Sequence, residues 1–156
     1  MKLGIVGSGM IVKEFLPIVH YLAKVELTAI CCTKRSEDVG RELGEKYDIK
    51  HIFTDYQDFL NSGVDTVYVA LPNHLHFQYT KEALEAGKHV IVEKPFTSTF
   101  EEALILSGLA REKRLFLFEA VTTLFLPNYK KSKRTAAVPG KYKNRAVKLF
   151  PVFQKI

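Results

Sequence analysis

The sequence has few cysteines, no long apolar run and no recognisable leader, and each absence excludes a class of protein. Its only cysteines, Cys31 and Cys32, are neighbours in an apolar stretch and cannot easily bridge each other, which excludes a disulfide scaffold. We expect both to be small core residues in a reducing compartment. No cysteine and histidine spacing matches a metal site, so no metal is expected. Without a membrane-spanning run or a signal-peptide pattern, a cytoplasmic protein without membrane contact is expected.

Acidic residues are absent from the last part of the chain. All 17 lie at or before Glu119, whereas nine of the 23 basic residues lie at or after Lys130, so the C-terminal residues produce the net charge of +6. A basic tail is typical of proteins that bind nucleic acid or an acidic surface. This tail lacks a regular interleaving of aromatic and basic residues, so a nucleic-acid partner is the less favoured interpretation.

A strand, a glycine turn and a helix open the chain. An apolar run over 2–6 predicts a buried strand, Gly7 and Gly9 follow, and an amphipathic run over 10–23 predicts a helix. In a dinucleotide-binding turn the first glycine permits the tight turn and the second admits a pyrophosphate, which the helix N-terminus attracts. Val12 occupies the third glycine position, so the fingerprint is incomplete. A strand-to-helix turn without a ligand is the alternative.

The rest of the pattern alternates strands and helices. Further strands are predicted over 26–33, 51–53, 66–70, 88–92 and 115–118, and further helices over 37–46, 55–61, 75–85 and 99–112. The predicted N-caps are Ser36, Asp55, Asn73 and Thr99, and the helix over 10–23 is expected to bury Ile11, Phe15, Ile18, Val19 and Leu22. This alternation predicts an α/β fold with a doubly wound parallel sheet of about six strands.

Ligands of an open parallel sheet bind beyond the carboxyl ends of its strands, so the residues after each strand are candidate site residues. Thr33, Lys34 and Arg35 follow the second strand, where an NAD protein places an acidic residue on the ribose 2′-hydroxyl. Arg35 suits a bidentate contact with a 2′-phosphate and Lys34 adds a point charge, so NADP is preferred and NAD is the alternative. Both cations are solvated loop residues in the competing interpretation.

The end of the fourth strand carries two histidines. Pro72 stops the strand, Asn73 opens the next helix, and His74 and His76 lie close to the expected cleft. By composition alone, a histidine in such a loop is more often structural than functional.

The end of the fifth strand carries a lysine. Lys94 follows Glu93 and precedes Pro95, which fixes the turn. The side chain of Lys94 is therefore expected to point into the cleft. Its ammonium group suits a contact with a ribose hydroxyl, a substrate hydroxyl or a carboxamide. An ion pair with Glu93 or with another acidic residue is the alternative.

Together these strand ends resemble one family, the glucose–fructose oxidoreductase, inositol dehydrogenase and rhizopine-catabolism group of NAD(P)-dependent oxidoreductases. The resemblance covers residues 1–130, and within the group the sugar and dihydrodiol dehydrogenases are most similar. The matching segments are Gly-Ile-Val-Gly-Ser-Gly over 4–9, Asp-Thr-Val-Tyr-Val-Ala-Leu-Pro-Asn-His-Leu-His over 65–76, Ala-Gly-Lys-His-Val-Ile-Val-Glu-Lys-Pro over 86–95, Phe-Glu-Ala over 118–120 and Phe-Leu-Pro over 125–127. The Gly-Lys-His-Val and Glu-Lys-Pro block is the most specific of these.

The resemblance implies a dinucleotide-binding Rossmann domain over 1–130 and a role for each strand end. The pyrophosphate would be lined by Gly7, Ser8, Gly9, Met10 and Ile11. The adenosine ribose would face Thr33, Lys34 and Arg35, and the nicotinamide side would be lined by Leu71, Pro72, Asn73 and His76. Glu93 and Lys94 would lie near the nicotinamide ribose, with Lys94 as the catalytic residue that reaches the substrate hydroxyl. The resemblance also implies a cis peptide bond before Pro95.

The resemblance ends near residue 131. Family members continue into a second α/β domain with the substrate pocket, an acid/base group and usually the dimer interface, and the tail over 131–156 does not match it. Decoding the tail in a shifted reading frame restores the family pattern together with the missing acidic residue. We therefore interpret the chain as a truncated, frameshifted member with an aberrant basic tail.

The expected function is that of the NAD(P)-binding domain of an oxidoreductase acting on a sugar, polyol or dihydrodiol CH–OH group. Little dehydrogenase activity is expected from the chain alone, because hydride transfer needs both reactants oriented. The alternative is a non-enzymatic nucleotide-sensing or nucleic-acid-binding module. Homo-oligomers are expected if the apolar surface that the second domain would cover is exposed, with Leu124, Phe125, Leu126, Phe150, Val152 and Phe153 as its candidates.

Overall fold

The computed structural model describes residues 1–121. Its strands are β1 Lys2–Val6, β2 Glu26–Cys31, β3 His51–Phe53, β4 Thr66–Val69, β5 His89–Val92 and β6 Leu117–Glu119. Its α-helices are α1 Met10–Val19, α2 Glu37–Tyr47, α3 Tyr56–Leu60, α4 His76–Glu85 and α5 Phe100–Glu112, and two short 3₁₀ turns are η1 Lys34–Ser36 and η2 Asn73–Leu75. The expected tail, the end of the expected domain over 122–130 and the candidate self-association residues lie outside the described residues.

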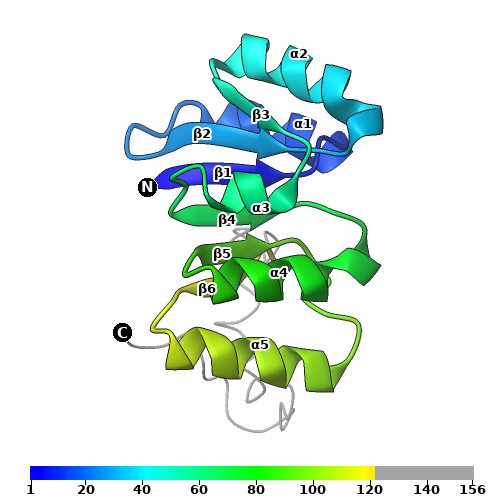
Figure 1. Cartoon of the computed structure of the whole chain (residues 1–156), viewed down its shortest axis with the longest axis vertical. Coiled ribbons are helices and arrows are strands. Elements are labelled where there is room, and N and C mark those ends of the chain that lie inside the picture. The colour runs from blue at the N-terminus through cyan, green and yellow to red at the C-terminus, as the bar shows by residue number, and fades with distance from the viewer. Residues whose placement is uncertain (122–156) are drawn as a thin grey trace, which may run out of the picture. The chain divides into compact units, whose positions relative to one another are not determined.

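The strands form one parallel sheet with the order β3-β2-β1-β4-β5-β6. The order reverses between β1 and β4, so the crossovers proceed from β1 toward one edge and from β4 toward the other. Figure 1 shows α3, α4 and α5 in front of the sheet and α1 behind it. This arrangement confirms the predicted doubly wound α/β fold, and it makes the carboxyl ends of β1 and β4 the switch point where ligands of such sheets bind.

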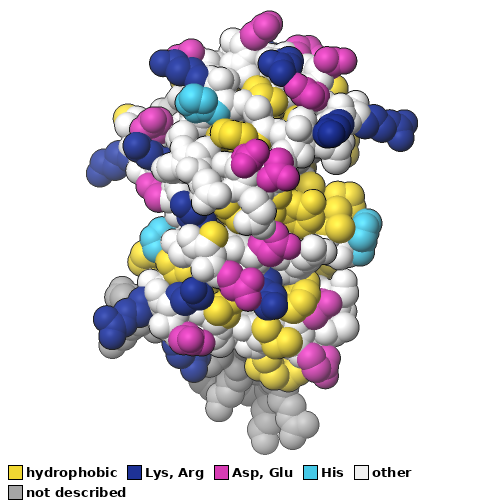
Figure 2. All heavy atoms as spheres, viewed as in Figure 1, with side chains coloured by type: hydrophobic (Ala, Val, Ile, Leu, Met, Phe, Trp, Pro, Cys, Tyr) yellow, Lys and Arg dark blue, Asp and Glu magenta, His cyan; other side chains and the backbone are white. Residues whose placement is uncertain are grey.

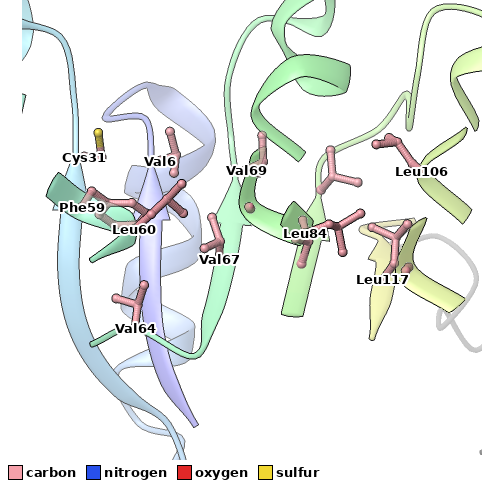
Figure 3. Packing of buried hydrophobic residues seen from close by; sticks show 14 of the residues in the cluster. Val6, Cys31, Phe59, Leu60, Val64, Val67, Val69, Leu84, Leu106 and Leu117 are labelled. Carbon is pink, nitrogen blue, oxygen red and sulfur yellow. The ribbon is translucent and has the colours of Figure 1, made fainter. Parts of the chain in front are cut away.

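Two apolar clusters cover the two faces of the sheet. On β4, Val67 and Val69 belong to the cluster under α3, α4 and α5, whereas Tyr68, and Ala70 directly after the strand, belong to the cluster that α1 and α2 cover. Figure 3 shows the first cluster, in which Val67 and Val69 lie between Leu60 of α3 and Leu84 of α4. Complete burial of one such side chain stabilises the fold by about 1.5–3 kcal/mol. Because both faces of the sheet are covered, all four residues of β4 are buried.

Helix α1 differs from the sequence prediction in its end and in its buried face. It ends at Val19 instead of residue 23, and it buries Val12, Leu16 and Val19. Among the residues expected inside, Ile11, Ile18 and Leu22 are exposed, Phe15 is partly buried and Val19 is buried. The sequence contains two adjacent apolar stripes, and packing against the sheet selects the stripe one residue away from the expected one. Residues beyond Val19 gain no burial that would favour continuing the helix.

Several other boundaries differ by one or two residues. Strand β2 ends at Cys31 instead of residue 33, because the chain turns into η1, and β6 covers 117–119 instead of 115–118. Asp55 and Thr99 are confirmed as capping side chains, whereas Ser36 flanks α2 without a side-chain cap bond. The prediction for Asn73 is wrong: it opens η2 without capping, and α4 begins at His76.

Cys31 and Cys32 are both free thiols and both buried, as expected for core residues. In the described part of the chain, no helix is long and apolar enough to cross a membrane.

Candidate functional site

The turn after β1 is built around Gly7, for two independent reasons. Its φ of +117° lies where residues with a Cβ are strained. A Cβ at this position would also meet the Ala70 carbonyl oxygen at 2.3 Å, because β4 runs directly beside β1. The Gly7 N–H donates to the Cys31 carbonyl at 2.8 Å, which ties the turn to β2 as well. The glycine is therefore required by the fold itself, whether or not a ligand binds.

Gly9 has the opposite surroundings. A Cβ built at Gly9 would meet no atom within 4 Å, so its absence leaves open space at the N-terminus of α1. Gly9 is the N-cap of α1, no side chain caps the helix, and its first turn contains no acidic residue. The first N–H groups and the positive end of the helix dipole thus have no acceptor from a capping side chain. This cradle fits an anion such as a pyrophosphate.

An open groove of about 510 Å³ extends from this cradle to the turn after β2. Its walls are Ser8, Gly9, Met10 and Lys13 on one side and Ser36 and Val39 on the other. Lys13, Ser36 and Val39 were not among the site residues selected from the sequence. Lys13 lies one turn inside α1, and only the helical period combined with the position of β2 identifies it as a groove residue.

The turn after β2 presents unpaired cations next to the groove. Thr33, Lys34 and Arg35 are exposed, and within residues 1–121 neither cation forms an ion pair. The Thr33 and Ser36 hydroxyl groups lie 2.9 Å apart, which fixes the turn that carries the two cations between them. The structure therefore brings the Thr33–Arg35 segment and the glycine turn to one edge of the sheet.

The turn after β4 separates the predicted nicotinamide-side residues into two groups. Pro72 and Asn73 are exposed and Leu71 is partly buried. His76 is completely buried, and its Nδ1 and Nε2 atoms lie 2.8 Å from the carbonyl oxygens of Pro95 and Leu71. Its ring therefore lies beneath the two turns instead of on the surface of the site.

In the turn after β5, Lys94 is exposed, whereas the side chain of Glu93 accepts two hydrogen bonds. The Tyr68 hydroxyl donates to Glu93 Oε1 at 2.5 Å, and the Lys94 N–H donates to Glu93 Oε2 at 3.2 Å. No ion pair joins Lys94 to Glu93 in the described part of the chain, which contradicts the ion-pair alternative. Burial, and then the bond to Glu93 and its charge, raise the pKa of Tyr68 well above its ordinary value, so this tyrosine stays a donor.

Two further observations complete the turn after β5. The Lys94–Pro95 peptide bond is cis, as the resemblance implied. Glu119, at the end of β6, accepts from the Phe96 N–H at 2.8 Å. Tyr68 and Glu119 were not among the site residues selected from the sequence, because their bonds to Glu93 and to the Phe96 N–H join segments more than 20 residues apart.

Comparison with known proteins agrees with this geometry. The model of an oxidoreductase family with the NAD-binding Rossmann fold, Gfo/Idh/MocA, matches residues 1–121. The chain is 34% identical over 135 residues to scyllo-inositol 2-dehydrogenase (NADP(+)) IolU of Bacillus subtilis (strain 168), covering 86% of this chain and 40% of that protein. It is 33% identical over 130 residues to the uncharacterized oxidoreductase YgjR of Escherichia coli (strain K12), covering 83% of this chain and 39% of that protein.

A solved structure shows the same fold. The 3-ketoreductase KijD10 from Actinomadura kijaniata, in complex with TDP-benzene and NADP, superposes with a TM-score of 0.80 at 32% identity, covering 87% of this chain and 43% of that chain. The chain thus spans about two fifths of the length of the relatives it matches. With the parallel sheet, the glycine turn and the family match over residues 1–121 in agreement, the chain belongs to the Gfo/Idh/MocA family of oxidoreductases, and its described residues are that family's NAD(P)-binding Rossmann domain.

Proposed function

We propose that the chain binds NADP in preference to NAD, as the cofactor domain of an oxidoreductase acting on a sugar, polyol or dihydrodiol CH–OH group. The observation that carries this proposal is the groove that joins the uncapped N-terminus of α1 to the turn after β2. Its two ends match the two anionic groups of NADP, a pyrophosphate and a ribose 2′-phosphate. Bound NADP would supply or accept the hydride, and the residues of this chain would bind and orient it.

The charges around the groove favour a 2′-phosphate. Arg35 offers a planar fork that suits a phosphate, Lys34 and Lys13 add point charges, and Thr33 offers a hydroxyl group. The acidic residue nearest in sequence, Glu37, is already paired with Arg41. A 2′-hydroxyl would gain little from this set, so discrimination by charge favours NADP.

The remaining candidate residues are assigned by their position on neighbouring strands. We propose that Ser8, Met10 and Ile11 adjoin the pyrophosphate, and that Leu71, Pro72 and Asn73 adjoin the nicotinamide. Lys94 is the candidate catalytic residue, because it is exposed beside the β4 turn and no described acidic side chain occupies its ammonium group. In that place it would donate a hydrogen bond to the substrate hydroxyl and orient it.

The proposal concerns a domain over 1–130. Because these 156 residues span about two fifths of the relatives' length, we propose that alone they bind the cofactor but transfer little hydride. Figure 2 shows acidic and basic side chains intermixed on the face in view, which does not favour nucleic-acid binding there.

The test is a titration of the purified chain with NADPH and with NADH, followed by nicotinamide fluorescence. We expect tighter binding of NADPH, and we expect Arg35→Ala to weaken NADPH binding about 10-fold or more while changing NADH binding about 2-fold or less. Arg111→Ala is the matched control: it removes the same charge from an exposed position on α5, which contributes no residue to the groove.

Each other outcome overturns a stated part of the proposal. Tighter binding of NADH would keep the fold and reject the role of Arg35. Binding of neither cofactor would reject the proposed function, and salt-sensitive retention on DNA without cofactor binding would favour the nucleic-acid alternative.

A further inference from the structure

We infer that His76 is a positioning residue: its buried ring ties the turn after β4 to the turn after β5 and so holds the nicotinamide half of the site in register. This inference rests on the proposed function for its consequence and on the described contacts for its geometry. His76 is the first residue of α4 and its side chain is 0% exposed, so it has no surface with which to touch a cofactor directly. Any effect it has on the site must pass through the atoms that it binds.

Those atoms belong to the two turns that carry the candidate residues. Nε2 lies 2.8 Å from the Leu71 carbonyl oxygen, which immediately precedes Pro72, and Nδ1 lies 2.8 Å from the Pro95 carbonyl oxygen, one residue after Lys94. Carbonyl oxygens only accept, so the ring N–H donates to the carbonyl that it faces, while the other ring nitrogen stays in contact with the second carbonyl. The ring is therefore a bridge between two segments that are 24 residues apart in the chain, Leu71 and Pro95.

The main chain of His76 anchors the bridge to the helix. Its N–H donates to the Asn73 carbonyl and closes η2, and the Leu75 N–H donates to the Pro72 carbonyl at 2.9 Å. The position of the ring is thus fixed by α4, which packs against β4 and α5 through Ala83 and Leu84 in the core. The start of α4 therefore sets the backbone position from which the ring reaches the two carbonyl oxygens.

The residues on either side of Lys94 are held by contacts with side chains from other elements. Glu93, before it, is held by the Tyr68 hydroxyl, the Pro95 carbonyl after it is held by His76, and the Phe96 N–H is held by Glu119. Of these restraints, only the one from His76 also reaches the turn after β4. Without the ring, Lys94 would stay near β5 but lose its fixed position relative to Leu71 and Pro72.

The adenosine half of the site does not depend on this bridge. Thr33, Arg35 and the groove residues lie on the β1 and β2 side, and His76 contacts none of them through a described hydrogen bond. The inference therefore predicts a selective effect, on the nicotinamide half alone, which a general loss of stability would not produce.

The first experiment compares two ligands on His76→Phe, which keeps a ring and removes both ring nitrogens. We expect NADPH affinity to fall about 10-fold or more and the affinity for 2′,5′-ADP, which lacks the nicotinamide half, to change about 2-fold or less. His74→Phe is the matched control, because His74 is exposed on the same 3₁₀ turn and should change neither affinity. Equal losses for both ligands, or no loss for either, would overturn the inference.

A second experiment needs no cofactor and separates the two ring contacts. The side-chain amide nitrogen of Asn lies near the place of Nδ1 and that of Gln near Nε2, so His76→Asn should keep the bond to Pro95 and His76→Gln the bond to Leu71. We expect amide hydrogen exchange to quicken over 71–75 in His76→Asn and over 94–97 in His76→Gln, with α2 unchanged in both. The same exchange pattern in both variants, or wild-type exchange in both, would overturn the inference.

The two experiments also distinguish this inference from the proposed function. If the wild-type chain binds neither NADPH nor 2′,5′-ADP, the proposed function fails. The exchange experiment then still decides whether His76 joins the two turns.

Discussion

At the scale of single residues, two glycines of one turn have different reasons to be glycine. Gly7 is fixed by its positive φ and by the Ala70 carbonyl 2.3 Å from any Cβ. Gly9 faces open space and has an ordinary φ of −78°. The same substitution at the two positions should therefore have different consequences.

We expect Gly7→Ala to lower the free energy of unfolding by about 2 kcal/mol or more, because it adds backbone strain to a clash with β4. Gly9→Ala should change the free energy of unfolding by about 0.5 kcal/mol or less and weaken NADPH binding about 10-fold, because its methyl group enters the space proposed for the pyrophosphate. Urea unfolding and NADPH titration of both variants measure this. A stable Gly7→Ala variant, or unimpaired cofactor binding by Gly9→Ala, would contradict the respective assignment.

At the scale of elements, helix α5 shows how a local motif fixes a boundary. Thr99 Oγ1 accepts from the Glu102 N–H at 3.2 Å, and Glu102 Oε2 accepts from the Thr99 N–H at 3.2 Å, which is a complete capping box. The helix then buries Ala103, Leu106 and Ala110 against the sheet. The cap is independent of the cofactor site, so its loss should affect stability alone.

Thr99→Ala should lower the free energy of unfolding by about 1 kcal/mol, because the Glu102 N–H loses its acceptor. Ser107→Ala in the same helix serves as the control, and it should raise stability by about 0.5 kcal/mol or less through helix propensity. Chemical denaturation of both variants provides the measurement, with NADPH affinity expected to stay at the wild-type value. An unchanged Thr99→Ala stability would mean that the box contributes nothing in this fold.

At the scale of the whole molecule, buried acids that remain protonated make the fold sensitive to alkali. Burial, and then the charges of Cys32 and Asp55, raise the pKa of the Cys31 thiol from its ordinary 9.0 to about 12. Burial first, and then nearby groups, also raise the pKa values of Tyr56 and Tyr68 above their ordinary 10.0. All three groups are neutral when protonated, and the native state favours that form.

Stability should therefore fall as pH rises from about 9 toward 12, since the unfolded chain releases these protons there while the native chain retains them. At pH values well below 9 both states are protonated at these groups, and they add no pH dependence. Urea unfolding at about pH 8 and about pH 10.5 gives the comparison, and Cys31→Ala should show a smaller decrease. Equal free energies of unfolding at the two pH values would contradict the upward shift of these three pKa values.

The sequence alone predicted those features of the fold whose physical cause lies within a few residues along the chain. Apolar runs marked the buried strands, Asp55 and Thr99 marked two helix starts, and the glycine turn with Lys94 marked the edge of the sheet that carries the candidate site. These features depend on backbone conformation and on neighbours within a few residues. They can therefore be identified without knowledge of the tertiary structure.

Tertiary structure decided what depends on contacts between distant segments. Packing on the sheet selected Val12, Leu16 and Val19 over the neighbouring apolar stripe of α1. Because β4 lies beside β5, Glu93 accepts a hydrogen bond from Tyr68, and Lys94 forms no ion pair among the described residues. From the sequence, an ion pair of Lys94 with an acidic residue was an open alternative. They also turned His76 inward, onto two carbonyl groups that no sequence pattern identifies, because a buried polar ring must take the acceptors that the fold places around it.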